Sequence, residues 1–143
     1  MTNREFRDTL EDRTARYAVN VFKFLRELPY DVSVKVITYQ LGKSASSIGA
    51  NYHEANRSES REDFIHKVSI ALKEANESCY WFKVVTGLYG ESMPLNALIK
   101  ETYELRNLLQ SILKGTKSSR KFSNSPLDLT PPLIHSLTPP HKK

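Results

Sequence analysis

The chain has 143 residues, of which 39% are hydrophobic and 26% are charged, which suits one domain with one modest hydrophobic core. Its formal net charge of +5 is unevenly distributed, because residues 116–143 carry five basic residues against one acidic residue, which leaves residues 1–115 nearly neutral. An apolar run long enough to cross a membrane is absent and the first residues are charged, so we expect a cytoplasmic protein without a membrane anchor or secretory signal.

A first helix is predicted over about residues 9–28, where apolar residues recur at helical spacing before Pro29. Its apolar face consists of Ala18, Val21, Phe22, Leu25 and Leu28. Basic residues lie largely opposite this face or beside it, namely Arg13, Arg16, Lys23 and Arg26. These four residues are candidate contacts to nucleic acid, with support from Lys117, Arg120 and Lys121 near the C-terminus.

A second helix is predicted over about residues 31–52, with Asp31 as its N-terminal cap. Its core-facing residues are Val34, Ile37, Leu41, Ala45, Ile48 and Tyr52. A neighbouring stripe contains only small residues, Gly42, Ala45, Ser46 and Gly49. Glycine is costly inside a helix unless packing requires it, so we expect this stripe to face a third helix at Ala71, Ala75 and Ser78 and to make the closest helix pair.

The third helix is predicted over about residues 61–86, after a capping pattern formed by Ser60 and Asp63. The fourth is predicted over about residues 93–114, with Gly115 just past its end. Four helices of similar length with short connections predict an all-α fold, an antiparallel up-and-down four-helix bundle. The bundle would occupy residues 1–115.

The third helix also carries three consecutive aromatic residues, Tyr80, Trp81 and Phe82. A helix cannot bury three consecutive side chains in its own bundle, so at least one of them is expected to face another subunit. Cys79 precedes them and is the one cysteine, which excludes an internal disulfide. Its place in the apolar pattern predicts a buried, inert thiol.

Residues 116–143 form the predicted tail, which is rich in Ser, Pro and Lys. This composition is typical of a disordered segment. The sequence Leu-Thr-Pro-Pro occurs at 129–132 and again at 137–140. The alternative interpretation is therefore a short docking peptide in polyproline conformation.

Three motifs carry a family resemblance: S-I-G-A-N-Y-x-E-A at 47–55, D-F-I-x-K-x-S-I-A-L-K-E-A at 63–75 and Y-W-F at 80–82. They resemble the small bacterial four-helix-bundle proteins named for the 23S rRNA intervening sequences that encode some of them. The resemblance extends over about residues 10–115 and implies an up-and-down bundle that assembles as a ring-shaped homopentamer. The family includes accessory proteins of diversity-generating retroelements, which bind nucleic acid and a reverse transcriptase.

The polar turn between the second and third helices contains Asn51, Glu54 and Arg57, which combine amide, acid and base. One interpretation is structural: Asn51 and Glu54 satisfy backbone donors and pair with nearby arginine side chains, which holds the two helices in register. The alternative is that this turn lies on the rim of a ring and contacts a ligand.

Motifs for catalysis are incomplete in this sequence. Gly42-Lys43-Ser44 lacks the earlier glycine of a phosphate-binding loop, and no serine lies in a G-x-S-x-G turn. Asp63 and His66 form only one of the two carboxylate-x-x-His elements that a di-metal bundle needs, so His66 is expected at the surface or an interface. We therefore expect no enzymatic activity, no metal and no cofactor; an active site assembled between subunits is the third possibility.

Two functions from different classes follow from these observations. The leading hypothesis is a non-enzymatic oligomeric adaptor that binds RNA or DNA, or a nucleic-acid enzyme such as a reverse transcriptase. The alternative is a structural or protein-binding bundle without nucleic-acid affinity, whose tail recruits a partner.

Overall fold

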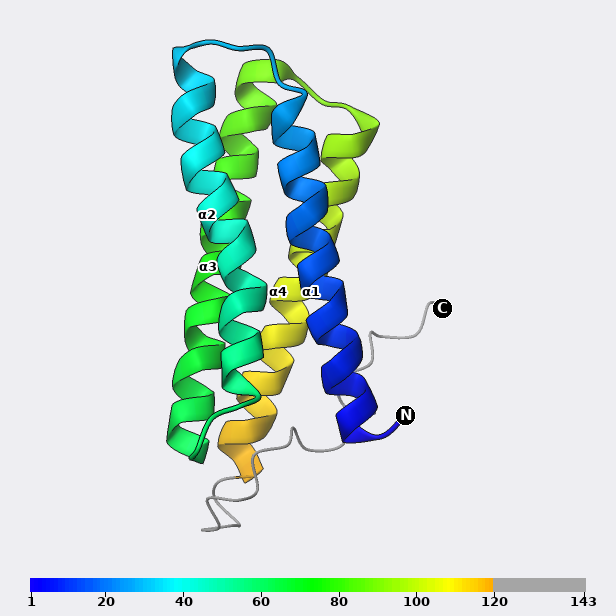
Figure 1. The fold of residues 1–143 in the computed structure, drawn as a ribbon, viewed down its shortest axis with the longest axis vertical. Coiled ribbons are helices and arrows are strands. Elements are labelled where there is room, and N and C mark those ends of the chain that lie inside the picture. Colours follow the sequence, from blue (N-terminus) through cyan, green and yellow to red (C-terminus); the bar gives the residue numbers. More distant parts are fainter. Residues whose placement is uncertain (120–143) are drawn as a thin grey trace.

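The structure, a computed structural model, describes residues 1–119. It contains the helices α1 (Asn3–Arg26), α2 (Val32–Ala55), α3 (Arg61–Tyr89) and α4 (Met93–Ser119). The helices lie side by side, and each begins at the end of the molecule where the previous one stops (Figure 1). Residues 1–119 contain no strand, so the predicted all-α fold of four helices is confirmed.

Side-chain caps fix the starts of the helices. Asp31 Oδ1 accepts a hydrogen bond from the Val34 amide at 3.0 Å, as the sequence predicts for α2. The predicted cap of α3 is also confirmed, because Ser60 Oγ accepts from the amide of Asp63 at 3.0 Å. At the start of α4, Ser92 Oγ accepts from the Leu95 amide at 3.2 Å.

The predicted start of the first helix near Thr9 is wrong, since α1 begins at Asn3. Thr2 and Glu5 form a capping box there: Thr2 Oγ1 accepts from the Glu5 amide, and the Glu5 carboxylate accepts from the Thr2 amide, both at 3.0 Å. Arg4 and Arg7 therefore belong to the helix.

The predicted end of the fourth helix is also wrong, because α4 continues through Gly115 to Ser119. Thr116 is buried, and its Oγ1 donates to the carbonyl oxygen of Ile112 at 2.7 Å. This packing holds the last turn onto the bundle. None of the described helices is long and apolar enough to span a membrane.

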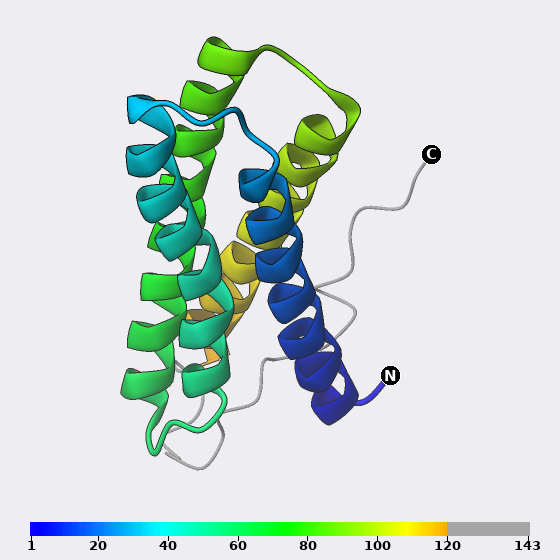
Figure 2. The same ribbon diagram turned by 45° about the horizontal axis from the view of Figure 1, so that its top comes forward.

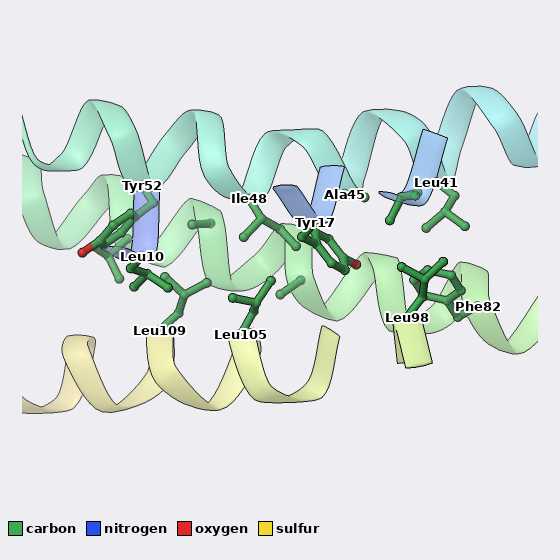
Figure 3. Close-up of a cluster of buried hydrophobic side chains, with 14 of the residues drawn as sticks. Leu10, Tyr17, Leu41, Ala45, Ile48, Tyr52, Phe82, Leu98, Leu105 and Leu109 are labelled. Atoms are coloured by element: carbon green, nitrogen blue, oxygen red, sulfur yellow. The ribbon is translucent and has the colours of Figure 1, made fainter. Parts of the chain in front are cut away.

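The buried face of α1 differs from the predicted one. It consists of Leu10, Thr14, Tyr17, Val21 and Leu25. Tyr17 lies in the row of core side chains in Figure 3, where its hydroxyl is 2.6 Å from Thr102 Oγ1. Phe22, predicted to be in the core, is 43% exposed and lies over Gly42 of α2. Polar groups that bond across the core thus replace part of the apolar face that the sequence indicates.

Helices α2 and α3 make the most extensive contact, and Ser44 Oγ lies 2.9 Å from Ser78 Oγ in their buried interface. The predicted orientation of the glycine stripe is nevertheless wrong, because its glycines face α1. A Cβ atom on Gly49 would lie 2.8 Å from Thr14 Oγ1, and one on Gly42 would lie 2.7 Å from the Phe22 ring. The glycines of the stripe therefore leave room for side chains of α1 to pack against the backbone of α2.

The three consecutive aromatic residues have three different environments. Phe82 is 1% exposed and belongs to the core, so it offers no surface to a neighbouring subunit, and only Tyr80 and Trp81 are left for the expected contact. Trp81 is half-buried, and Tyr80 is 58% exposed. Cys79 is half-buried, whereas the sequence predicts full burial, and burial raises the pKa of its thiol.

Candidate functional site

The basic residues of α1 divide into two groups. Arg16, Lys23 and Arg26 are exposed, and they form no ion pair or hydrogen bond with residues 1–119. Arg13 instead binds α4, where its Nε and Nη2 atoms donate to both carboxylate oxygens of Glu101, each at 2.7 Å. Hydrogen bonding to Glu101 raises the pKa of Arg13. The guanidinium group therefore stays protonated, and its charge is balanced by the carboxylate of Glu101.

Of the predicted basic residues near the C-terminus, Lys117 does not join this surface. Lys117 lies in the last turn of α4, at the end of the bundle opposite to Arg26 (Figure 2). Arg120 and Lys121 lie outside the residues that the structure describes.

The residues of the polar turn serve several contacts. Asn51 Nδ2 donates to the Ser47 carbonyl oxygen in its own helix at 2.8 Å, so it satisfies an acceptor and not a donor. Glu54 pairs with Lys67 of α3 at 2.9 Å, which joins α2 to α3 as the structural interpretation requires, but through a lysine. The exposed His66 lies one residue before this lysine.

Arg57 connects the same turn to α1. Its Nη1 atom donates to Glu11 Oε2 at 2.9 Å and to the His53 carbonyl oxygen at 2.8 Å. Glu11 also accepts from Asn56 Nδ2 at 2.8 Å, and its Oε1 atom lies 3.1 Å from His53 Nδ1. Burial raises the pKa of Glu11, but the hydrogen bonds from Arg57 and Asn56 outweigh burial, so the pKa is lowered overall.

These contacts border a polar pocket of about 340 Å³ at the N-terminal end of α1, which we call the end pocket. Its lining residues are Arg4, Arg7, Asp8, Glu11, Asn56 and Arg57. The sequence prediction does not include it, because the predicted first helix starts after residues 4 and 7. A signal is nevertheless present, since Arg4, Arg7 and Glu11 have the i, i+3, i+7 spacing of one helix face.

Two further pockets are mainly apolar. One lies between α3 and α4, beside Cys79, Lys83 and Tyr103, and the other lies between α1 and α4, beside Phe24 and Leu98. Within residues 1–119, no group of three or more His, Cys, Asp or Glu side chains is arranged to hold a metal ion. Among these three pockets, the end pocket is therefore the one lined by the most charged side chains.

Comparisons with known proteins give the family. The model of the 23S rRNA-intervening sequence protein family matches residues 10–111. The chain is also similar to a protein of unknown function from the S23 ribosomal protein family of Bacteroides thetaiotaomicron, with 37% identity and a TM-score of 0.63 over 73% of this chain and 97% of that one. None of the curated proteins matches. The chain belongs to the 23S rRNA-intervening sequence protein family, as the motifs of its second and third helices predict.

Proposed function

We propose that this protein is a non-enzymatic oligomeric adaptor that binds nucleic acid through the outer face of α1. The observation that carries the proposal is the set of exposed, unpaired basic side chains Arg16, Lys23 and Arg26. Arg13 is left out of this face because Glu101 and Glu104 neutralise it. Such side chains bind phosphates without reading bases, so affinity should be mainly electrostatic.

A ring of subunits makes this weak face useful. Three basic residues per chain give little affinity, but symmetry repeats them on one assembly and raises avidity. The family resemblance supports an up-and-down bundle assembled as a homopentamer, with a reverse transcriptase of a diversity-generating retroelement as a candidate protein partner. Tyr80 and Trp81 offer apolar surface for contacts between subunits.

The alternative function is a protein-binding bundle without nucleic-acid affinity, whose tail recruits a partner. It is favoured by a second observation, the exposure of Val32, Val36 and Tyr39 on α2. Their i, i+4, i+7 spacing places them on one outer face of the helix, where they would suit a protein surface.

Binding of a short RNA and a short duplex DNA at two salt concentrations tests the leading proposal. The triple variant Arg16→Gln, Lys23→Gln, Arg26→Gln should bind more weakly, and its dependence of log K on log salt should be shallower by about one for each phosphate that is no longer neutralised. Arg13→Gln is the matched control on the same helix. It should keep the salt dependence and lose at most about 1 kcal/mol of stability, because its ion pairs are partly exposed.

A chain ending at Ser119 tests the contribution of the tail. Binding by the full chain alone would move the electrostatic contacts to residues 120–143 and refute the assignment to α1. Absence of binding by either chain at low salt would favour the protein-binding alternative.

A further inference from the structure

Helices α1 and α4 border a groove of about 480 Å³ near the end of the molecule where α1 stops and α4 begins (Figure 1). We call it the α1–α4 groove. Its apolar lining consists of Phe24, Pro94, Ala97 and Leu98, and its polar lining consists of Asn20, Lys23 and Glu27. Pro94 and Ala97 are exposed, so no part of residues 1–119 covers the apolar surface of this groove.

The groove is open because α1 and α4 pack least closely among the four neighbouring helix pairs. Their polar links, from Tyr17 to Thr102 and from Arg13 to Glu101, lie further along α4. Toward the start of α4, the small side chain of Ala97 leaves space beside α1. An apolar groove that contains an aromatic side chain suits a proline-rich peptide, which loses little conformational entropy when it docks in polyproline conformation.

Residues 129–140 of this chain have the composition of such a peptide. Their sequence, LTPPLIHSLTPP, contains four prolines and four aliphatic residues, and it contains no Asp, Glu, Lys or Arg. Asp128 directly precedes them and is the one acidic residue of the sequence from 120 to 143. Lys23 in the groove forms no ion pair with residues 1–119, so its charge is complementary to that of Asp128.

The length of the chain after α4 brings the first half of this segment to the groove. At about 1.5 Å per residue, Leu98 lies about 32 Å from Ser119 along the axis of α4. A polyproline chain that runs straight back along α4 covers this distance in about ten residues, at about 3.1 Å each. Residue 129 then comes level with Leu98, and residue 131 comes level with Pro94. The second LTPP repeat would pass beyond the end of the bundle.

We propose that residues 129–134 dock in the α1–α4 groove of their own chain in polyproline conformation. The aliphatic side chains of this segment cover Phe24, Ala97 and Leu98, and the Asp128 carboxylate pairs with Lys23. The docking goes beyond the proposed function and does not depend on nucleic-acid binding, because Arg16 and Arg26 lie outside the groove.

Disulfide trapping in the full chain tests this docking, in a Cys79→Ser background that has no other thiol. Ala97→Cys is combined with Thr130→Cys, because the register brings residue 130 level with Ala97. The control combines Ala50→Cys with Thr130→Cys. Ala50 is also an exposed alanine, and it lies on α2 near the end of the bundle where α4 stops (Figure 1). In a glutathione buffer, residues 97 and 130 should form a disulfide within one chain at least about tenfold more readily than the control pair, because docking raises the effective concentration of the two thiols.

Substitutions in the segment test how it is held. Replacement of both prolines by Pro131→Gly and Pro132→Gly should reduce trapping several-fold, because the more flexible chain loses more entropy on docking. Asp128→Lys should reduce trapping about two- to fivefold, the contribution of an exposed ion pair, and Lys23→Asp in the same chain should restore it. Circular dichroism verifies that the helices of each variant are retained.

Three results would overturn the proposal. Equal trapping of residue 130 at residues 97 and 50 would exclude docking in the groove. Disulfides that form only between chains would exclude docking within one chain. Trapping that neither the glycine nor the charge substitutions reduce would show that residues 97 and 130 meet only because they belong to one chain.

Discussion

Two glycine residues of α2 differ in how much freedom their neighbours have. A Cβ atom on Gly49 would meet Thr14 Oγ1 at 2.8 Å and Thr14 Cβ at 2.9 Å, and Thr14 is buried between the helices. A Cβ atom on Gly42 would meet the ring of Phe22, which is partly exposed and can rotate toward solvent. Only the first contact fixes the distance between α1 and α2.

Gly49→Ala should therefore destabilise the protein by about 1–3 kcal/mol through overpacking, despite the higher helix propensity of alanine. Gly87→Ala is the matched control, because Gly87 also lies within a helix but has no atom within 4 Å of its added Cβ. It should raise stability by up to about 1 kcal/mol. Urea unfolding measures both, and equal effects of the two substitutions would contradict the close approach at Gly49.

Among the elements, α2 and α3 are easier to predict than α1. Asp31 and Ser60 are local caps that directly precede apolar runs, so the helix starts follow from sequence. The cap of α1 is harder to recognise because polar residues follow it, and its buried face is misplaced because Tyr17 enters the core through a hydrogen bond to a residue of α4. The periodicity of apolar residues does not reveal a buried hydrogen bond between residues that are distant in the sequence.

The contact of α1 with the turn after α2 makes the stability of the fold depend on pH through Glu11. Hydrogen bonds lower its pKa in the folded protein below the ordinary value of 4.5. A lowered pKa means that the stabilisation by Glu11 is complete above that ordinary value and is lost as the pH falls through the lower, folded-state pKa. The free energy of unfolding should decrease on acidification in this range.

Glu11→Gln should make the decrease of the unfolding free energy with falling pH less steep. It should also lower stability at neutral pH, because Arg57 loses its charged partner. Glu59→Gln, a substitution of an exposed residue in the same turn, is the control and should show the same dependence of unfolding free energy on pH as the wild type. Chemical denaturation at a series of pH values from about 3 to 7 measures the slopes. Identical slopes in wild type and Glu11→Gln would show that other carboxylates control acid unfolding.

At the scale of the whole molecule, tertiary pairing decides which charges are available, and the sequence alone does not reveal it. Arg13 and Arg16 look equivalent on α1, yet Arg13 pairs with Glu101, which is 88 residues away in the chain. The end pocket likewise combines residues 4–11 with residues 56 and 57. Apolar periodicity and local caps predict the number and order of the four helices correctly, whereas both candidate sites depend on contacts between distant segments.

The proposed ring predicts that apolar surface on the outside of the bundle lies between subunits. Tyr80 is more than half exposed and stacks edge-on against the half-buried Trp81, with 5.1 Å between ring centroids. Light scattering at low micromolar concentration should give a mass of about five times the 16.4 kDa of one chain, where the number five comes from the family resemblance. Tyr80→Glu should reduce the mass without loss of helicity, since it places a charge in the expected interface. Tyr103→Glu, on α4, should leave the mass unchanged, and a wild-type mass of one chain would refute the ring.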